Sequence, residues 1–115
     1  MNSFVTPLLN TAFPNYLSVL GGRHKIRFDE ITLIEGQRNY TLFKCIDATQ
    51  ILTSKSLSWY QKCLPPYLFR VHKSYFVNLT FIVAFDGETI QLANGQRVVV
   101  SRRRRSAVRR LVRLS

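Results

Sequence analysis

The stretch that decides the fold class is residues 81–100, which read FIVAFDGETIQLANGQRVVV. Three short runs rich in β-branched and aromatic residues are separated by Asp86-Gly87 and Asn94-Gly95. These dipeptides favour tight hairpin turns, because their residues tolerate a positive φ. The stretch therefore predicts three short antiparallel strands, over 81–85, 89–92 and 97–100.

The same alternation of short apolar runs and turn residues extends back to residue 25 and predicts a mainly β domain. Further strands are expected at 25–28, 31–35, 40–46, 50–54 and 69–71. One helix is expected at 56–64, because Leu57, Tyr60 and Leu64 fall on one face before two prolines end the pattern. Residues 74–78 are expected to form a tight turn or a single helical turn.

The first 22 residues differ from the rest of the chain. They carry no charge, contain two prolines and end in Gly21-Gly22. We therefore expect an N-terminal extension over 1–22, joined by a flexible hinge to a single domain over 23–115. The apolar residues of this extension would pack on the domain or on a second copy of the chain.

Positive charge is concentrated toward the C-terminus. The chain has 17 Lys and Arg against 6 Asp and Glu, a formal net charge of +11, and eight arginines with no acid from Arg97 onward. A field of this sign attracts polyanions such as nucleic acid, an anionic membrane or an acidic protein. Ser101 is expected to cap a helix whose first-turn arginines and free N–H groups form an anion site. That helix would dock through an apolar stripe made of Ala107, Val108, Leu111 and Val112. The competing interpretation is a disordered basic tail.

The residue types that enzymes and metal sites need are scarce. No two carboxylates form a recognisable pair, and Cys45 and Cys63 make no zinc-binding motif with His24 or His72. We therefore expect no catalysis, no cofactor, no metal and no small-molecule substrate, and two reduced thiols rather than a disulfide. There is no run of 18 apolar residues and no signal peptide, so a cytoplasmic location is expected.

Three stretches carry a resemblance to one family. Residues 31–43 read ITLIEGQRNYTLF, residues 68–79 read LFRVHKSYFVNL, and residues 90–104 read IQLANGQRVVVSRRR. In this order and spacing they resemble the LytTR DNA-binding domain of bacterial response regulators, over about residues 24–113. The resemblance implies an elongated arrangement of small antiparallel β-sheets with a short helix and a C-terminal basic helix. It also implies loops that enter successive major grooves of double-stranded DNA and bend it, with two copies bound to paired direct repeats.

The resemblance places the DNA contacts in three loops. The residues implied are Gln37, Arg38, Asn39, Tyr40, His72, Lys73, Ser74, Ser101, Arg102, Arg103, Arg104 and Arg105. Arg38 suits guanine, Asn39 suits adenine, and Arg102 matches the family's base-contacting arginine. Lys73 is expected on a base or a phosphate, and Ser74 and the other arginines of the third loop on phosphates.

Several of these residues also have a structural interpretation. Asn39 would cap a turn, His72 would be a hydrogen-bonded residue at a strand end, and Tyr40 would pack. Glu35 is expected to pair with a nearby arginine rather than to act as an acid. The core is expected to include Trp59, Tyr75 and Phe76, and Asn78 is expected in a structural turn.

The function predicted from the sequence is that of a non-enzymatic transcriptional regulator that binds double-stranded DNA sequence-specifically. The alternatives are a non-specific nucleic-acid coat and a basic module that binds an anionic membrane or an acidic protein. Only about 22 residues precede the domain, too few for the receiver domain usual in the family. Control by abundance or association, rather than by phosphotransfer, is therefore expected.

Overall fold

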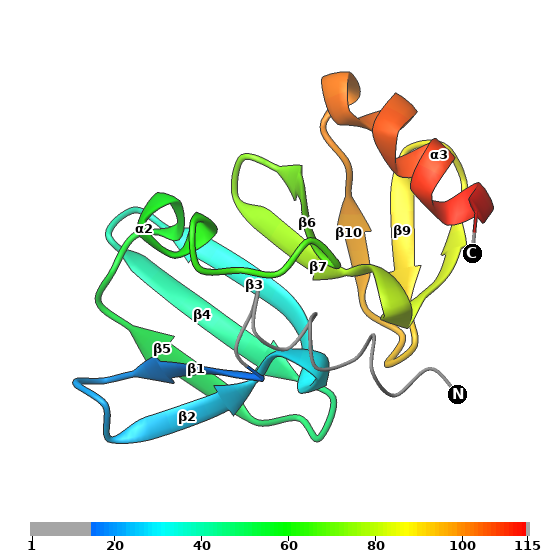
Figure 1. The fold of residues 1–115 in the computed structure, drawn as a ribbon. Coiled ribbons are helices and arrows are strands. Elements are labelled where there is room, and N and C mark those ends of the chain that lie inside the picture. Colours follow the sequence, from blue (N-terminus) through cyan, green and yellow to red (C-terminus); the bar gives the residue numbers. More distant parts are fainter. Residues whose placement is uncertain (1–14, 115) are drawn as a thin grey trace, which may run out of the picture.

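The computed structural model describes residues 15–114, and the side chains of residues 15–112. Within this part of the chain, short strands form three antiparallel sheets that are accompanied by short helices (Figure 1). The elements are β1 (Tyr16–Val19), β2 (His24–Arg27), η1 (Phe28–Glu30), β3 (Ile31–Gln37), β4 (Tyr40–Cys45), β5 (Gln50–Thr53), α2 (Leu57–Gln61), β6 (Leu68–His72), β7 (Tyr75–Asn78), η2 (Leu79–Phe81), β8 (Ile82–Phe85), β9 (Thr89–Leu92), β10 (Arg97–Val99), η3 (Arg102–Arg104) and α3 (Arg105–Leu114). The η elements are single 3-10 turns.

The largest sheet has the strand order β5-β4-β3-β7-β6, with β3 at its centre. Ile31, Leu33 and Ile34 are all buried, although strict alternation would point every second residue outward. The pairing with β4 shifts register between Ile31 and Leu33, where the Thr32 hydroxyl donates to the Lys44 carbonyl at 3.0 Å. Because of this irregularity, Ile31 and Ile34 join one hydrophobic core while Leu33 joins a second.

The other sheets and the helices pack on these two cores. The first includes Phe28, Phe43 and Tyr60 and lies between the five-stranded sheet, the β1–β2 hairpin and α2. The second joins the same sheet to the three-stranded sheet β10-β9-β8 and to α3. Val108 of α3 is fully buried there, a contribution of about 1.5–3 kcal/mol relative to an exposed side chain. The C-terminal helix is thus fixed on the domain, and the alternative of a disordered basic tail is wrong for residues 105–114.

Two strands lie where the sequence pattern predicted other structure. Residues 75–78 form β7, paired with both β3 and β6, whereas a turn was expected; the turn is Lys73-Ser74. Residues 16–19, expected in the extension, form β1, which pairs with β2 and buries Leu17 and Val19 in the first core. This part of the predicted extension packs on its own domain, and residues 1–14 lie outside the described residues.

Single residues also test the predicted core. Trp59 is 42% exposed and not buried, because α2 turns only Leu57 and Tyr60 inward, and the Lys55 and Lys62 ammonium groups lie 5.0 and 5.5 Å from the Trp59 ring. The structural interpretation of Asn78 is confirmed, since its side-chain amide donates to the Ile31 carbonyl at 2.9 Å and its oxygen caps η2.

Both cysteines, Cys45 and Cys63, are free thiols. Cys45 is buried in the first core, and this burial raises the pKa of its thiol to about 11. Among residues 15–114, no helix is long and apolar enough to cross a membrane, and no group of His, Cys, Asp and Glu could hold a metal ion.

Candidate nucleic-acid interface

Three connecting segments reach one edge of the molecule: the β3–β4 turn, the β6–β7 turn and η3 (Figure 1). Backbone hydrogen bonds join them. The Gly36 N–H donates to the Ser74 carbonyl at 2.8 Å, and the Ser101 N–H donates to the Val71 carbonyl at 2.8 Å. The three loops singled out by the sequence, residues 37–40, 72–74 and 101–105, therefore form one continuous surface, which we call the upper edge.

The β3–β4 turn exposes all four residues predicted there. Gln37 pairs with Tyr40, so Arg38 and Asn39 form a two-residue loop, and Arg38 has a φ of 53°, in the left-handed region that favours glycine. Tyr40 is 52% exposed, which does not fit its packing interpretation. Gly36 lets the loop approach α2 closely, since a Cβ at this position would lie 3.0 Å from Leu57 Cβ.

At the base of this turn, Glu35 has a different partner from the one predicted. Its carboxylate pairs with the Lys44 ammonium group at 3.5 Å, not with an arginine. Lys44 lies diagonally across the antiparallel β3–β4 ladder from Glu35, whose directly opposite residue is Leu42, whereas the arginines of the upper edge lie on other elements. Glu35 therefore balances a lysine on its own sheet, and among the described residues no carboxylate pairs with an arginine of the upper edge.

The three residues predicted in the β6–β7 turn have different surroundings. His72 is half-buried and its Nδ1 accepts a hydrogen bond from the Ser74 N–H at 3.1 Å, which fits the structural interpretation of this histidine. Lys73 is exposed at the tip, and Ser74 is half-buried with its carbonyl bonded to Gly36. Of the three, Lys73 is the side chain most accessible to a ligand.

The third loop begins with a tight turn rather than a capped α-helix. Ser101 precedes η3, but its hydroxyl makes no capping bond and instead accepts from Arg104 Nη1 at 3.2 Å, which corrects the predicted N-cap. Arg102 and Arg103 are exposed. Arg104 and Arg105 are half-buried, and Arg105 Nε donates to the Val100 carbonyl at 3.2 Å. The loop thus offers two fully exposed guanidinium groups and two that are partly held by the protein.

One residue of this surface was not singled out as a site residue from the sequence. Arg70 lies on β6, directly beneath the β6–β7 turn, and its guanidinium donates to Gln61 Oε1 at 2.6 Å. Partial burial, and then the positive charge of Arg104, lower the pKa of Arg70. The only sequence signal was its place inside the stretch 68–79. Its hydrogen-bond partners lie within nine residues of it in the sequence, but the sequence does not show that they converge on its guanidinium.

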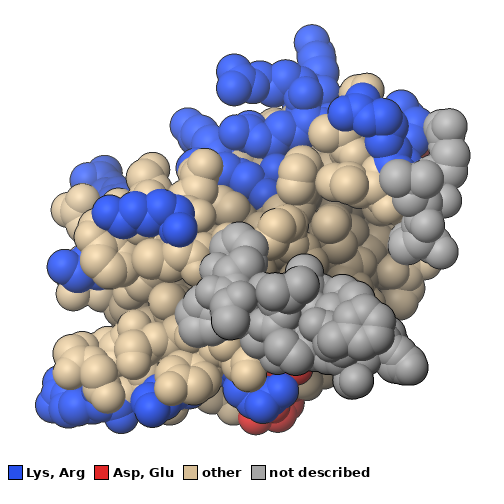
Figure 2. Space-filling view, in the orientation of Figure 1, with Lys and Arg blue, Asp and Glu red and all other residues tan. Residues whose placement is uncertain are grey.

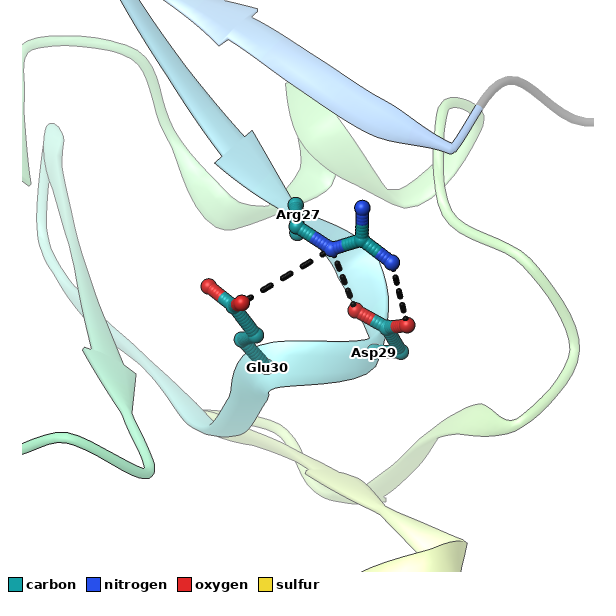
Figure 3. A network of polar contacts seen from close by, with 3 residues as sticks. All are labelled: Arg27, Asp29 and Glu30. Carbon is teal, nitrogen blue, oxygen red and sulfur yellow. Dashed lines mark hydrogen bonds and ion pairs between the residues drawn. The ribbon is translucent and has the colours of Figure 1, made fainter.

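The charge on the upper edge is of one sign. Figure 2 shows Lys and Arg gathered over η3, α3 and the β6–β7 turn. Further Lys and Arg lie at the left of this view and along the opposite edge, and Asp and Glu are visible only at that opposite edge. There, Arg27 binds the Asp29 carboxylate through Nε at 3.1 Å and Nη2 at 2.8 Å, and its Nε lies 3.7 Å from Glu30 (Figure 3). The hydrogen bond with Asp29 raises the pKa of Arg27 and lowers that of Asp29. Within the described residues no such ion pair involves residues 101–105.

The comparisons with known proteins show the family and the fold of this chain. A family model for the LytTr DNA-binding domain matches residues 21–113. Among solved structures, a LytTr DNA-binding domain from Bacillus cereus shares the fold with a TM-score of 0.70 and 22% identity, covering 85% of this chain and 96% of that chain. No curated protein matches the sequence. The predicted fold class is confirmed, and the chain belongs to the LytTR family of DNA-binding domains.

Proposed function

We propose that this domain binds double-stranded DNA sequence-specifically and regulates transcription, with the three loops of the upper edge as its contact surface. The observation that carries the proposal is the joining of these loops by the Gly36–Ser74 and Ser101–Val71 hydrogen bonds, next to arginines without acidic partners among the described residues. LytTR domains are DNA-binding regulators with a non-catalytic fold, which supports the same assignment.

Different side chains are assigned to bases and to phosphates. Arg38 and Arg102 are exposed at loop tips and have the forked donors that recognise guanine, while Asn39 has the donor and acceptor that recognise adenine. Lys73, Ser74, Arg103, Arg104 and Arg105 are assigned to phosphates or, for Lys73, to a base. Gln37 and Tyr40 complete the first loop, and Ser101 and His72 shape the other two.

The dimensions of the domain fit contact with more than one groove. Its longest extent is 42 Å, while one turn of B-DNA measures about 34–36 Å. A domain of this size that presents separate loops on one surface can enter successive major grooves on one face of the duplex, and bending the DNA would bring the outer loops into fuller contact. We extend the proposal to DNA bending and to two copies on neighbouring direct repeats.

The membrane alternative is disfavoured by the packing of α3. A helix that binds a bilayer needs a free apolar face beside its basic residues. Here Val108 is buried and Val112 packs against the second core, so these two members of the apolar stripe are already used by the domain.

Selection of bound duplexes from a random pool tests the proposal with the full chain. We expect recovery of a short motif, present as a direct repeat, that the double variant Arg38→Ala/Arg102→Ala no longer enriches. Gel mobility of fragments that carry the recovered site at different positions should then reveal a bend. Binding without any recovered motif would contradict sequence specificity and favour the non-specific coat, and no binding to duplex DNA would contradict the proposal altogether.

A deletion tests the pairing of two copies. Because Leu17 and Val19 are core residues, the informative deletion removes residues 1–14 only. If that segment assists pairing, affinity for one half-site should stay unchanged while affinity for the full direct repeat falls, since a tether raises the effective concentration of the second copy. Equal losses on both DNAs would contradict a pairing role for the segment.

A further inference from the structure

The guanidinium of Arg70 makes an unusual set of contacts for a basic residue next to a DNA-binding loop. Its Nη1 donates to Gln61 Oε1 on α2 at 2.6 Å, its Nη2 donates to the Lys73 carbonyl, and its Nε donates to the His72 carbonyl at 3.4 Å. The guanidinium carbon also lies 5.5 Å from the centre of the Phe76 ring, on β7. The planar guanidinium therefore links α2 to two backbone carbonyls of the β6–β7 turn. The His72 carbonyl lies just before the tip of the turn and the Lys73 carbonyl lies at the tip.

All of these acceptors are neutral. In the described part of the chain no carboxylate pairs with Arg70, while the charge of Arg104 lies close enough to disfavour its protonated form. A half-buried cation without a counter-charge is costly unless its donors are satisfied. Three of the five N–H donors of Arg70, one on each nitrogen, are occupied by acceptors of the protein itself, which orients the guanidinium toward the turn and α2.

The contacts of the turn extend this bracing to a second loop. The Ser74 carbonyl accepts from the Gly36 N–H at 2.8 Å, so the position of the β6–β7 turn also sets the end of the β3–β4 hairpin. Ser74 N–H in turn donates to His72 Nδ1 at 3.1 Å. A displacement of the Lys73-Ser74 backbone would therefore also move Arg38 and Asn39, because the Gly36–Ser74 hydrogen bond connects the two turns.

We infer that Arg70 is a positioning residue: it braces the β6–β7 turn against α2, holds the first two loops in register for adjacent contacts on DNA, and does not itself contact the DNA. The inference rests on the proposed function. It requires arginine specifically, because lysine carries the same charge but lacks the planar fork that serves three acceptors at once.

The salt dependence of binding separates a brace from a phosphate contact. Each phosphate contact contributes about −0.9 to the slope of log affinity against log salt. If Arg70 contacted a phosphate, Arg70→Met would make the slope shallower by about that amount, and Arg70→Lys would largely restore it. If Arg70 is a brace, both variants should keep the wild-type slope and lose affinity for the selected site by about tenfold, with binding to random duplex changed less than about twofold.

The experiment compares the wild type, Arg70→Met, Arg70→Lys and the milder Gln61→Ala, with Arg23→Lys as a matched control at the opposite edge. Thermal unfolding first establishes that each variant is folded. Binding to the selected and the random duplex is then measured across salt concentrations. A wild-type selectivity in Arg70→Lys, or a shallower slope in Arg70→Met, would overturn the inference.

Amide hydrogen exchange without DNA gives a second, independent readout. The Gly36 and Ser74 amides should exchange faster in both Arg70 variants than in the wild type. In Gln61→Ala their exchange should be slower than in the Arg70 variants, and in Arg23→Lys it should match the wild type. Unchanged exchange at Gly36 and Ser74 would overturn the inference even if DNA binding is altered. If the wild type shows no site preference at all, the proposed function fails, and the exchange measurement still decides whether Arg70 braces the turn.

Discussion

Arginines at two edges of this domain have opposite surroundings. At the edge opposite the upper edge, which we call the lower edge, Arg27 is held by Asp29 through two hydrogen bonds and lies near Glu30. At the upper edge, Arg102 and Arg103 are exposed, and the sequence has no acidic residue beyond Glu88. Arg27 therefore has a counter-charge from its own chain, whereas in the described part of the chain Arg102 and Arg103 have none.

The difference separates structural from functional charge. A surface pair such as Arg27–Asp29 is locally neutral and contributes little to a long-range field. Adjacent arginines without acids repel one another, so their arrangement costs free energy in the isolated domain and is relieved by an external anion. A positive charge does not by itself indicate a binding site. A polyanion partner is indicated when several positive charges lack acidic partners and lie on loops that the fold brings together.

The strongest test of this difference compares single arginine substitutions at the two edges. Arg102→Ala and Arg38→Ala should each cost about 1–3 kcal/mol on the selected site and relax preference at one or two base pairs. Arg27→Ala should leave DNA affinity nearly unchanged, because its guanidinium is already occupied by Asp29. Titrations of fluorescent duplexes with single base changes measure both effects, and equal losses at the two edges would abolish the distinction.

A second variant sharpens the contrast within the upper edge. Arg104→Ala should weaken binding to all sequences alike and make the salt slope shallower by about 0.9, since its assigned partner is a phosphate. The same titrations repeated on random duplex at several salt concentrations test this. A sequence-dependent loss would place Arg104 among the base-reading residues instead.

The strained backbone at the first loop gives a prediction about stability. Arg38 has a φ of 53°, a conformation that costs a non-glycine residue about 1–2 kcal/mol. Arg38→Gly relieves that cost but adds about 0.4–1 kcal/mol of unfolded-state entropy. We therefore expect a gain in urea-unfolding free energy of between zero and about 1.6 kcal/mol, together with weaker DNA binding. A loss of stability would show that the Arg38 side chain contributes to the fold.

The smallest effect is expected at the lower edge. Arg27 lowers the pKa of Asp29, so the stabilising contribution of this pair is present above the unfolded pKa of about 3.9 and is lost as pH falls through the folded value. Asp29→Asn should cost about 0.2–1 kcal/mol of unfolding free energy at pH 7 and less at pH 2. Chemical denaturation of both proteins at the two pH values measures the difference, and an equal cost at both would point to a role other than charge.

Local sequence predicted those parts of the fold whose signals are local. The turns at Asp86-Gly87 and Asn94-Gly95 depend on residues that accept positive φ, and Gly87 and Gly95 have φ values of 101° and 90°. The β7 strand was missed because no glycine or asparagine marks the Lys73-Ser74 turn before it. The β1 strand was missed because the burial of Leu17 and Val19 depends on pairing with β2, which an uncharged segment does not reveal.

The sequence likewise predicted some parts of the candidate site and not others. The three loops were predicted from the family motifs, and their placement on one surface follows from the fold. The role of Arg70 could not be predicted, because its partners come from α2 and from backbone carbonyls whose positions exist only after folding. The exposure of Trp59, by contrast, agrees with helical periodicity, because Trp59 lies off the α2 face that carries Leu57 and Tyr60.

The most direct test of the central claim is the salt dependence of DNA binding by the full chain. If the uncompensated arginines of the upper edge bind phosphates, six or more contacts predict a plot of log affinity against log salt with a slope of about −5 or steeper. Replacing both Arg103 and Arg104 by alanine should make that slope shallower by about 2, whereas Arg27→Ala should leave it unchanged. A nearly flat plot for the wild type, or an equal change on removing Arg27, would contradict the account.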